Sequence, residues 1–124
     1  MTYDIVDNTG HVTASSDLKG VISNANVTSW TRDIEFENTG ILTVTDNYST
    51  TGGVTAIFQV NTPTLPTVVG NVITTSNLRV EVLTPVSPTI NIVNMTSLGA
   101  EFNSGYRIDI SGGTGTYEVT LEPI

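Results

Sequence analysis

The sequence predicts an all-β fold: an antiparallel β-sandwich of Ig-like or jelly-roll-like type, or a small β-barrel. Short segments of alternating apolar and polar residues recur along the chain, separated by turn-forming Gly, Asn and Pro about every 8–12 residues. No segment shows helical periodicity, and 22 of the 124 residues are threonine, whose β-branched side chain favours strands. We therefore expect about eight or nine short strands and no substantial helix.

The best-defined segment is the C-terminal run 106–122. Residues 106–110 alternate with apolar side chains at the even positions, and residues 117–122 alternate with apolar side chains at the odd positions. Between them, residues 111–115 contain three glycines, which adopt positive φ at little cost. The pattern predicts a β-hairpin whose two arms pair with each other.

A second hairpin is predicted around Asn38-Thr39-Gly40, with a three-residue loop that ends in glycine. Ile34 and Phe36 on its first arm and Leu42 and Val44 on its second arm are expected to face inward.

The other elements follow from the same alternation and from the turn residues. Residues 17–31 are less regular than the rest, and the proline segments 62–66 and 84–88 are expected to be extended connections, because proline cannot donate to a strand ladder. Further strands are expected at 2–6, 11–15, 21–22, 27–30, 54–60, 68–74, 78–83 and 89–95.

We expect residues 1–124 to form one β domain, with residues 1–31 as a partly extended contact arm. A chain of this length buries roughly two-thirds of its unfolded surface, so it can hold a core without cross-links. The absence of cysteine excludes a disulfide framework, a thiolate metal site and a cysteine nucleophile.

Charge argues against several classes of partner. Twelve acidic residues stand against four basic ones, and the net charge is -8. Nucleic-acid binding needs a basic surface, and an anionic membrane would repel this chain. The N-terminus has neither the basic region nor the apolar region of a signal peptide, so we expect synthesis in the cytoplasm without secretion.

No constellation of residues predicts catalysis, and we expect no enzyme. His11, the single histidine, has no Ser, Cys or second His at useful spacing. The carboxylate pairs Glu35–Glu37 and Glu118–Glu122 are expected to face solvent, where they keep the sheet soluble and block edge pairing.

No metal or cofactor is expected. Asp46-Asn47 together with Asp17, or with Asp4 and Asp7, could hold Ca²⁺, but the spacing of a calcium loop is lacking and Asx turns explain these residues better. Residues 111–115 are glycine-rich like a phosphate loop, yet they lack the Lys and the following helix that such a loop needs.

Aromatic side chains supply the remaining candidate site. Trp30, Asp46 and Tyr48 are the residues that we expect to contact a partner or ligand, with Tyr48 exposed in a polar loop over residues 46–53. Other aromatic residues fall mostly on inward positions of predicted strands.

Ser111-Gly112-Gly113-Thr114-Gly115-Thr116-Tyr117-Glu118-Val119 resembles the last hairpin of bacterial Ig-like surface repeats. The whole chain is similar in character to small accessory proteins of tailed-phage virions: short, acidic, all-β, without cysteine and rich in Thr, Gly and Asn. The second resemblance implies a capsid decoration protein, often a trimer, located in the virion and bound to capsid or other virion proteins. The alternative is an Ig-like carbohydrate-binding or adhesin module of a phage or bacterial surface protein.

Overall fold

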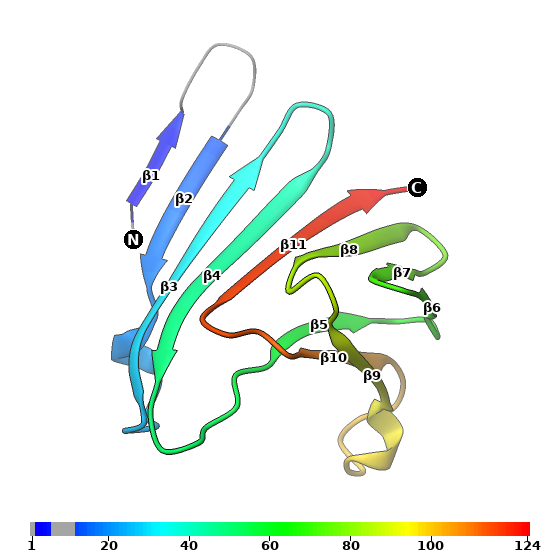
Figure 1. The fold of residues 1–124 in the computed structure, drawn as a ribbon. Helices are drawn as coiled ribbons and strands as arrows, with labels where there is room; N and C mark the ends of the chain where they lie inside the picture. The colour runs from blue at the N-terminus through cyan, green and yellow to red at the C-terminus, as the bar shows by residue number, and fades with distance from the viewer. Residues whose placement is uncertain (1, 6–11) are drawn as a thin grey trace.

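The chain folds as two antiparallel β-sheets of unequal width that pack face to face (Figure 1). The computed structural model describes residues 2–5 and 12–124. Within these residues neither sheet closes into a barrel, and the only helical turns are two short 3₁₀ segments, η1 (Lys19–Val21) and η2 (Met95–Ser97). The predicted β-sandwich is therefore confirmed.

The large sheet has eight strands in the order β1-β2-β3-β4-β11-β8-β7-β6. Its N-terminal half is a meander in which each strand follows its neighbour in sequence, and β11 joins that half to the C-terminal half. The strands are β1 (Thr2–Ile5), β2 (Val12–Asp17), β3 (Val27–Phe36), β4 (Leu42–Thr50), β11 (Thr116–Pro123), β8 (Leu78–Thr84), β7 (Val72–Thr74) and β6 (Thr67–Val69).

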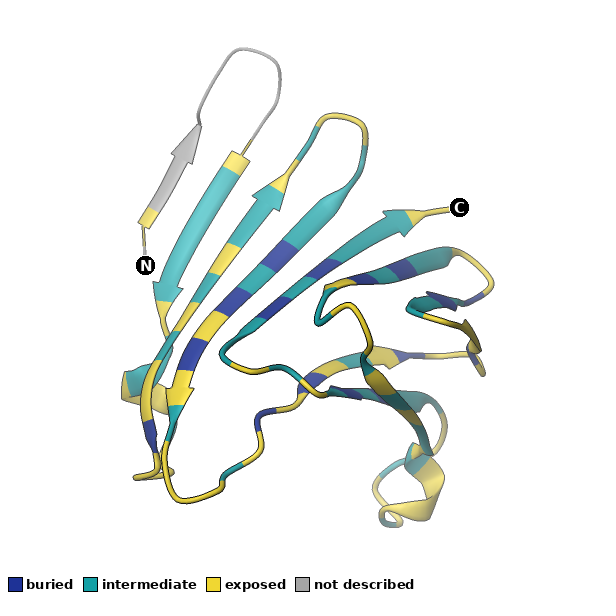
Figure 2. Ribbon diagram, in the orientation of Figure 1, coloured by how far each residue is buried: buried dark blue, intermediate teal, exposed yellow. Residues whose placement is uncertain are grey.

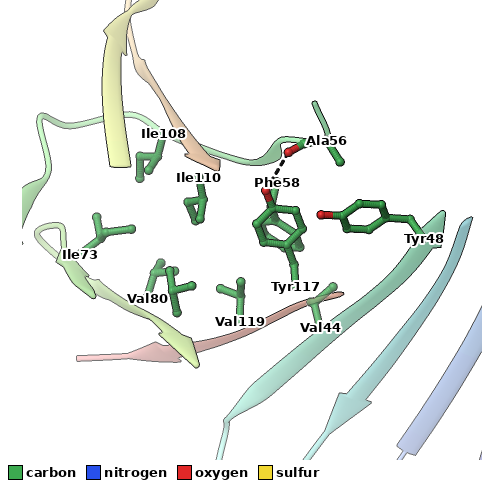
Figure 3. Packing of buried hydrophobic residues seen from close by; sticks show 11 residues of the cluster. Val44, Tyr48, Ala56, Phe58, Ile73, Val80, Ile108, Ile110, Tyr117 and Val119 are labelled. Atoms are coloured by element: carbon green, nitrogen blue, oxygen red, sulfur yellow. Dashed lines mark hydrogen bonds between the residues drawn. The ribbon is translucent and has the colours of Figure 1, made fainter. Parts of the chain in front are cut away.

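The small sheet has three strands, β5 (Phe58–Thr62), β10 (Tyr106–Ser111) and β9 (Thr89–Asn94), with β10 in the centre. It lies against the part of the large sheet formed by β11, β8 and β7 and by one end of β4 (Figure 1). The core forms between them, because alternate residues of each strand point into this space (Figure 3). Its buried members are Val44, Tyr48, Ala56, Phe58, Ile73, Val80, Val82, Ile108, Ile110, Tyr117 and Val119.

The predicted C-terminal hairpin is wrong. β10 pairs with β5 and β9 in the small sheet, whereas β11 pairs with β4 and β8 in the large sheet. The glycine-rich segment 111–115 therefore carries the chain from one sheet to the other. Gly112 and Gly115 do have positive φ, at 99° and 119°, so the local turn chemistry was inferred correctly although the pairing was not.

The second predicted hairpin is confirmed. Gly40 N–H donates to Glu37 O at 2.9 Å and Glu37 N–H donates to Ile41 O at 2.9 Å, which closes a three-residue loop with Gly40 at φ 91°. Cross-strand register places Ile34 opposite Val44 and Phe36 opposite Leu42. Phe36 nevertheless remains exposed, since no strand of the small sheet reaches it.

Three other predicted segments differ from the structure. Residues 68–74 form two strands, because Gly70 (φ 61°) and Asn71 make a tight turn between β6 and β7. Residues 54–57 lie outside β5, which begins only at Phe58. Residues 21–22 form no strand, and Val21 ends η1.

The predicted contact arm, residues 1–31, contributes β1, β2, η1 and the first part of β3 within its described residues. These strands extend the large sheet at one edge, through pairing of β1 with β2 and of β2 with β3. The arm is thus continuous with the sheet, and its role in contacts remains a prediction.

The crossover 111–115 gives a test of how the sheets are joined. A Cβ on Gly113 would lie 2.7 Å from Tyr117 Cζ and 2.7 Å from the Tyr48 hydroxyl, both in the packed core. We expect Gly113→Ala to lower the free energy of unfolding by about 1–3 kcal/mol through overpacking, measured by urea denaturation. Gly20→Ala is the control, because a Cβ there meets no described atom within 4 Å; equal losses in both variants would contradict the packing argument.

Candidate functional site

The structure brings the three predicted contact residues together on the inner face of β3 and β4. Cross-strand register pairs Trp30 with Tyr48 and Arg32 with Asp46. The rings of Trp30 and Tyr48 stack with centroids 5.0 Å apart. Because these positions are two residues apart on each strand, all four side chains point to the same face.

The aromatic stack continues into the core. The ring of Tyr48 stacks on that of Tyr117 at 5.7 Å, and Tyr117 packs against Phe58 of the small sheet at 6.0 Å. The Tyr117 hydroxyl donates to Ala56 O at 2.7 Å (Figure 3). The same hydroxyl accepts from Gly113 N–H at 3.2 Å. Burial raises the pKa of Tyr117 above its usual value. This hydroxyl therefore ties the large sheet to the segment that leads into β5.

An ion pair between fully buried Asp46 and partly exposed Arg32 lies beside the stack. Arg32 donates from Nε and from one terminal nitrogen to the two oxygens of Asp46, each at 2.6 Å. Asp46 is fully buried, and the Arg32 guanidinium lies 5.3 Å from the centroid of the Phe58 ring. Hydrogen bonding to Asp46 raises the pKa of Arg32 above its usual value, so the guanidinium stays charged.

This arrangement corrects the expected position of Tyr48. Tyr48 lies within β4 and is 8% exposed, so it is not in an exposed polar loop. The Asp46 carboxylate is occupied by Arg32, which leaves it unsuited to bind Ca²⁺. Trp30 Nε1 and the Tyr48 hydroxyl are buried without a hydrogen-bond partner among the described residues.

One hollow of about 420 Å³ borders Tyr48. It lies between the end of β4, the segment before β5 and the glycine-rich crossover. Its lining carries no charge and consists largely of hydroxyl and backbone groups: Tyr48, Ser49, Thr50, Val54, Thr55, Ala56, Gly112, Gly113, Thr114 and Gly115. Such a surface suits a neutral ligand that forms hydrogen bonds.

A second hollow, of about 490 Å³, lies on the outer face of β2, β3 and β4. Threonine and serine hydroxyls line it together with the carboxylates of Asp33 and Glu35. Its outward-facing lining residues are Thr2, Thr13, Ser15, Asp33, Glu35, Thr43 and Thr45. Ala14 and Ile34 lie between them along β2 and β3 and also border the hollow, but their side chains point to the inner face.

The other two arginines form ion pairs with carboxylates on their own or neighbouring strands. Arg79 bridges Glu81 and Glu122, at 2.7 and 2.9 Å, and Arg107 pairs with Asp109, which lowers the pKa of that carboxyl. Among the described residues no group of three His, Asp or Glu side chains could hold a metal ion.

Two of the four candidate calcium carboxylates, Asp17 and Asp46, have described side chains, and these point to opposite faces of the large sheet. Asp17 accepts from Lys19 N–H at 2.9 Å, as expected for an Asx turn. Asp7, the side chain of Asp4 and His11 lie outside the described residues.

The most extensive feature of the large sheet was missed by the sequence analysis. One row of inward apolar side chains crosses seven of the eight strands, all but β1, through successive cross-strand partners: Val12, Phe36, Leu42, Leu121, Val80, Ile73 and Val68. Val80 and Ile73 are 0% exposed, whereas Val12 is 39% and Phe36 45% exposed. From β11 toward β2, the small sheet no longer covers the row, and the side chains become more exposed.

We call this open part of the inner surface the uncovered face and define it by Val12, Ala14, Ile34, Phe36 and Leu42. Figure 2 shows the same contrast: the buried positions gather where the sheets overlap, and the free ends of β2 and β3 are half-buried or exposed. The register needed to recognise this face depends on pairing between distant strands, so the signal is weak in the sequence alone.

No protein-family model matches the chain, and no curated protein matches it. Among the described residues, no helix has the length and apolar character needed to cross a bilayer.

The Arg32–Asp46 pair can be tested by removing one charge. Asp46→Asn keeps the shape of the side chain but leaves a partly buried guanidinium without its counter-charge, so we expect the free energy of unfolding to fall by about 2–3 kcal/mol. Asp33→Asn is the matched control, because Asp33 is exposed on the neighbouring strand and should change stability by less than about 0.5 kcal/mol. Similar urea midpoints for both variants would show that the buried pair contributes little.

Proposed function

We propose that the chain is a structural protein of a virus particle, a capsid decoration protein that binds an assembled shell and stabilises it. The observation that supports this proposal is the uncovered face. Exposed apolar side chains that form a continuous surface mark sites where proteins associate. An eight-stranded sheet paired with only three strands is suited to being completed by other protein surfaces in an assembly.

The proposed mechanism is linkage by mass action. A protein that binds the assembled shell and not the dissociated subunits stabilises the shell by RT ln(1 + [L]/Kd), about 2.7 kcal/mol at a hundredfold excess over Kd. Burial of Phe36 and Val12 at a contact supplies apolar free energy at about 25 cal/mol per Å².

The assignment to a virus shell in particular rests on the resemblance of composition to tailed-phage accessory proteins. The net charge of -8 and the Thr-rich β surface belong to that resemblance. The remaining support is structural, and it concerns association with protein in general.

Binding to shells tests the proposal directly. The chain is mixed with expanded, undecorated shells assembled from the major capsid protein of the same genome, and binding is measured by co-sedimentation. We expect saturable binding and an increase in the melting temperature of the shell, because the ligand binds only the assembled form. Saturating protein that neither sediments with the shells nor changes their melting temperature would exclude decoration.

A second candidate function is carbohydrate binding, favoured by the hollow beside Tyr48. Its uncharged, hydroxyl-rich lining and its volume of about 420 Å³ suit one or two sugar rings. On this proposal the ligand lies over the end of β4 and not over the buried Asp46.

A glycan array with the full chain tests this second function. We expect binding that is lost in Thr55→Trp, whose indole fills the hollow, and kept in Thr31→Trp, at an exposed position on β3 outside the hollow. Absence of binding to any glycan would remove the candidate without affecting the shell proposal.

A further inference from the structure

We propose that the uncovered face is an interface between two copies of this chain, which pack with their β2–β4 segments face to face. The inference rests on the proposed function only in assuming that a protein covers this face. It goes further by naming a second copy of the chain as that protein, in a dimer that forms in solution before any shell is present.

The first argument is continuity with the core. Val12, Phe36 and Leu42 belong to the same register row as Val80 and Ile73, which the small sheet buries completely. The sheet surface thus keeps the chemistry of a sandwich interior beyond the edge of the small sheet. Partly buried Ile34 and Leu42 pack against the core from one side and are open on the other.

The second argument is charge. On a chain of net charge -8, two copies repel each other unless the surfaces that meet are neutral. Among the described inward positions of β2, β3 and β4, the only charged side chains are Arg32 and Asp46, which neutralise each other. The carboxylates of Asp33 and Glu35 line the hollow on the opposite face. The uncovered face therefore allows a second acidic copy to approach.

The third argument is geometry. A two-fold interface places the same patch of both subunits in contact, so the patch must fit itself. Two twisted sheets pack about 10 Å apart with their inner side chains interleaved, as in any aligned sandwich. Each copy supplies to the other a layer whose strands match the uncovered ones in number and length. Face-to-face packing gives a pair, in contrast to the trimer that the resemblance to decoration proteins implies.

An amphipathic helix of another protein is the main competing occupant, because it could also cover an apolar sheet face. A face that binds a basic helix would not need to be neutral, because carboxylates near the helix would attract its positive charges. The neutral surface on an acidic chain therefore favours the second copy.

The test is the mass of the full chain in solution, by sedimentation velocity over about 1–500 μM. We expect the mass to rise to twice the 13.2 kDa of one chain, with a Kd that Phe36→Ser raises at least about tenfold. Val86→Ser is the control, because Val86 is 87% exposed in the connector before β9 and lies outside the row. At protein concentrations where the chain is monomeric, both exposed substitutions should leave the urea midpoint nearly unchanged, which separates lost association from lost folding.

Cysteine protection locates the interface. The chain has no cysteine, so Ala14→Cys introduces one thiol on the uncovered face and Thr13→Cys one on the opposite face of the same strand. We expect alkylation by iodoacetamide to slow with increasing protein concentration at position 14 and not at position 13.

A chain that remains monomeric at every concentration would overturn the inference, as would a trimer, or a dimer in which Phe36→Ser and Val86→Ser weaken association equally. Shell binding is measured separately. A monomer that sediments with shells would refute this inference alone, and a dimer that ignores shells would refute decoration alone.

Discussion

The structure depends on one constraint: the apolar face of a β-sheet must be covered, and the small sheet covers only part of the large one. Where the sheets overlap, Val80, Val82, Ile108 and Ile110 are fully buried and the sandwich is complete. Beyond the covered end of β4 the same alternation continues through β3 and β2, and none of the described residues forms a layer opposite them. The uncovered face is thus a direct result of unequal strand numbers and not of any unusual residue.

The boundary between covered and uncovered sheet is where the polar residues of the inner face lie. Arg32 and Asp46 face each other in the β3–β4 register, with Trp30 and Tyr48 as the next pair. Because side chains alternate with period two, a slip of one residue would move Asp46 to the outer face and separate it from Arg32. The pair therefore favours the observed register at the place where apolar packing from the small sheet ends.

Alternation along single strands could be predicted from the sequence, and strand pairing could not. The spacing of Ile108 and Ile110, and of Val119 and Leu121, correctly indicated which side chains point inward. The hairpin inferred from residues 106–122 was wrong because glycine allows the chain to turn but does not decide whether the next strand returns to its neighbour or crosses to another sheet. Long-range contacts favour the crossing, such as the hydrogen bond from the Tyr117 hydroxyl to Ala56 O.

At the candidate site too, the direction of each side chain could be predicted from the sequence, whereas its surroundings could not. Tyr48 was placed in a loop because Asp46 and Asn47 are polar, yet Leu42 and Val44 already set a period that puts Asp46 and Tyr48 on the inner face. A charged residue at an inward position requires a partner, and Arg32 occupies the matching position on the facing strand. The uncovered face had no comparable local signal, because Phe36 and Val12 look like ordinary core residues until the width of each sheet is known.

Exposed apolar residues are common on protein surfaces, so position distinguishes the uncovered face more than exposure does. Val21 and Val86 are more exposed than Phe36, but one ends a 3₁₀ turn and the other lies in a connector, and neither belongs to a register row. Val12 and Phe36 are neighbours across two paired strands and continue a row that is buried at its centre. The row is buried at its centre and exposed at both ends, at Val68 on one side and at Val12 and Phe36 on the other. The wider exposed end, over β2 and β3, is better explained by a missing layer than by chance exposure, and the neutrality of this face allows the same surface of a second copy to supply that layer.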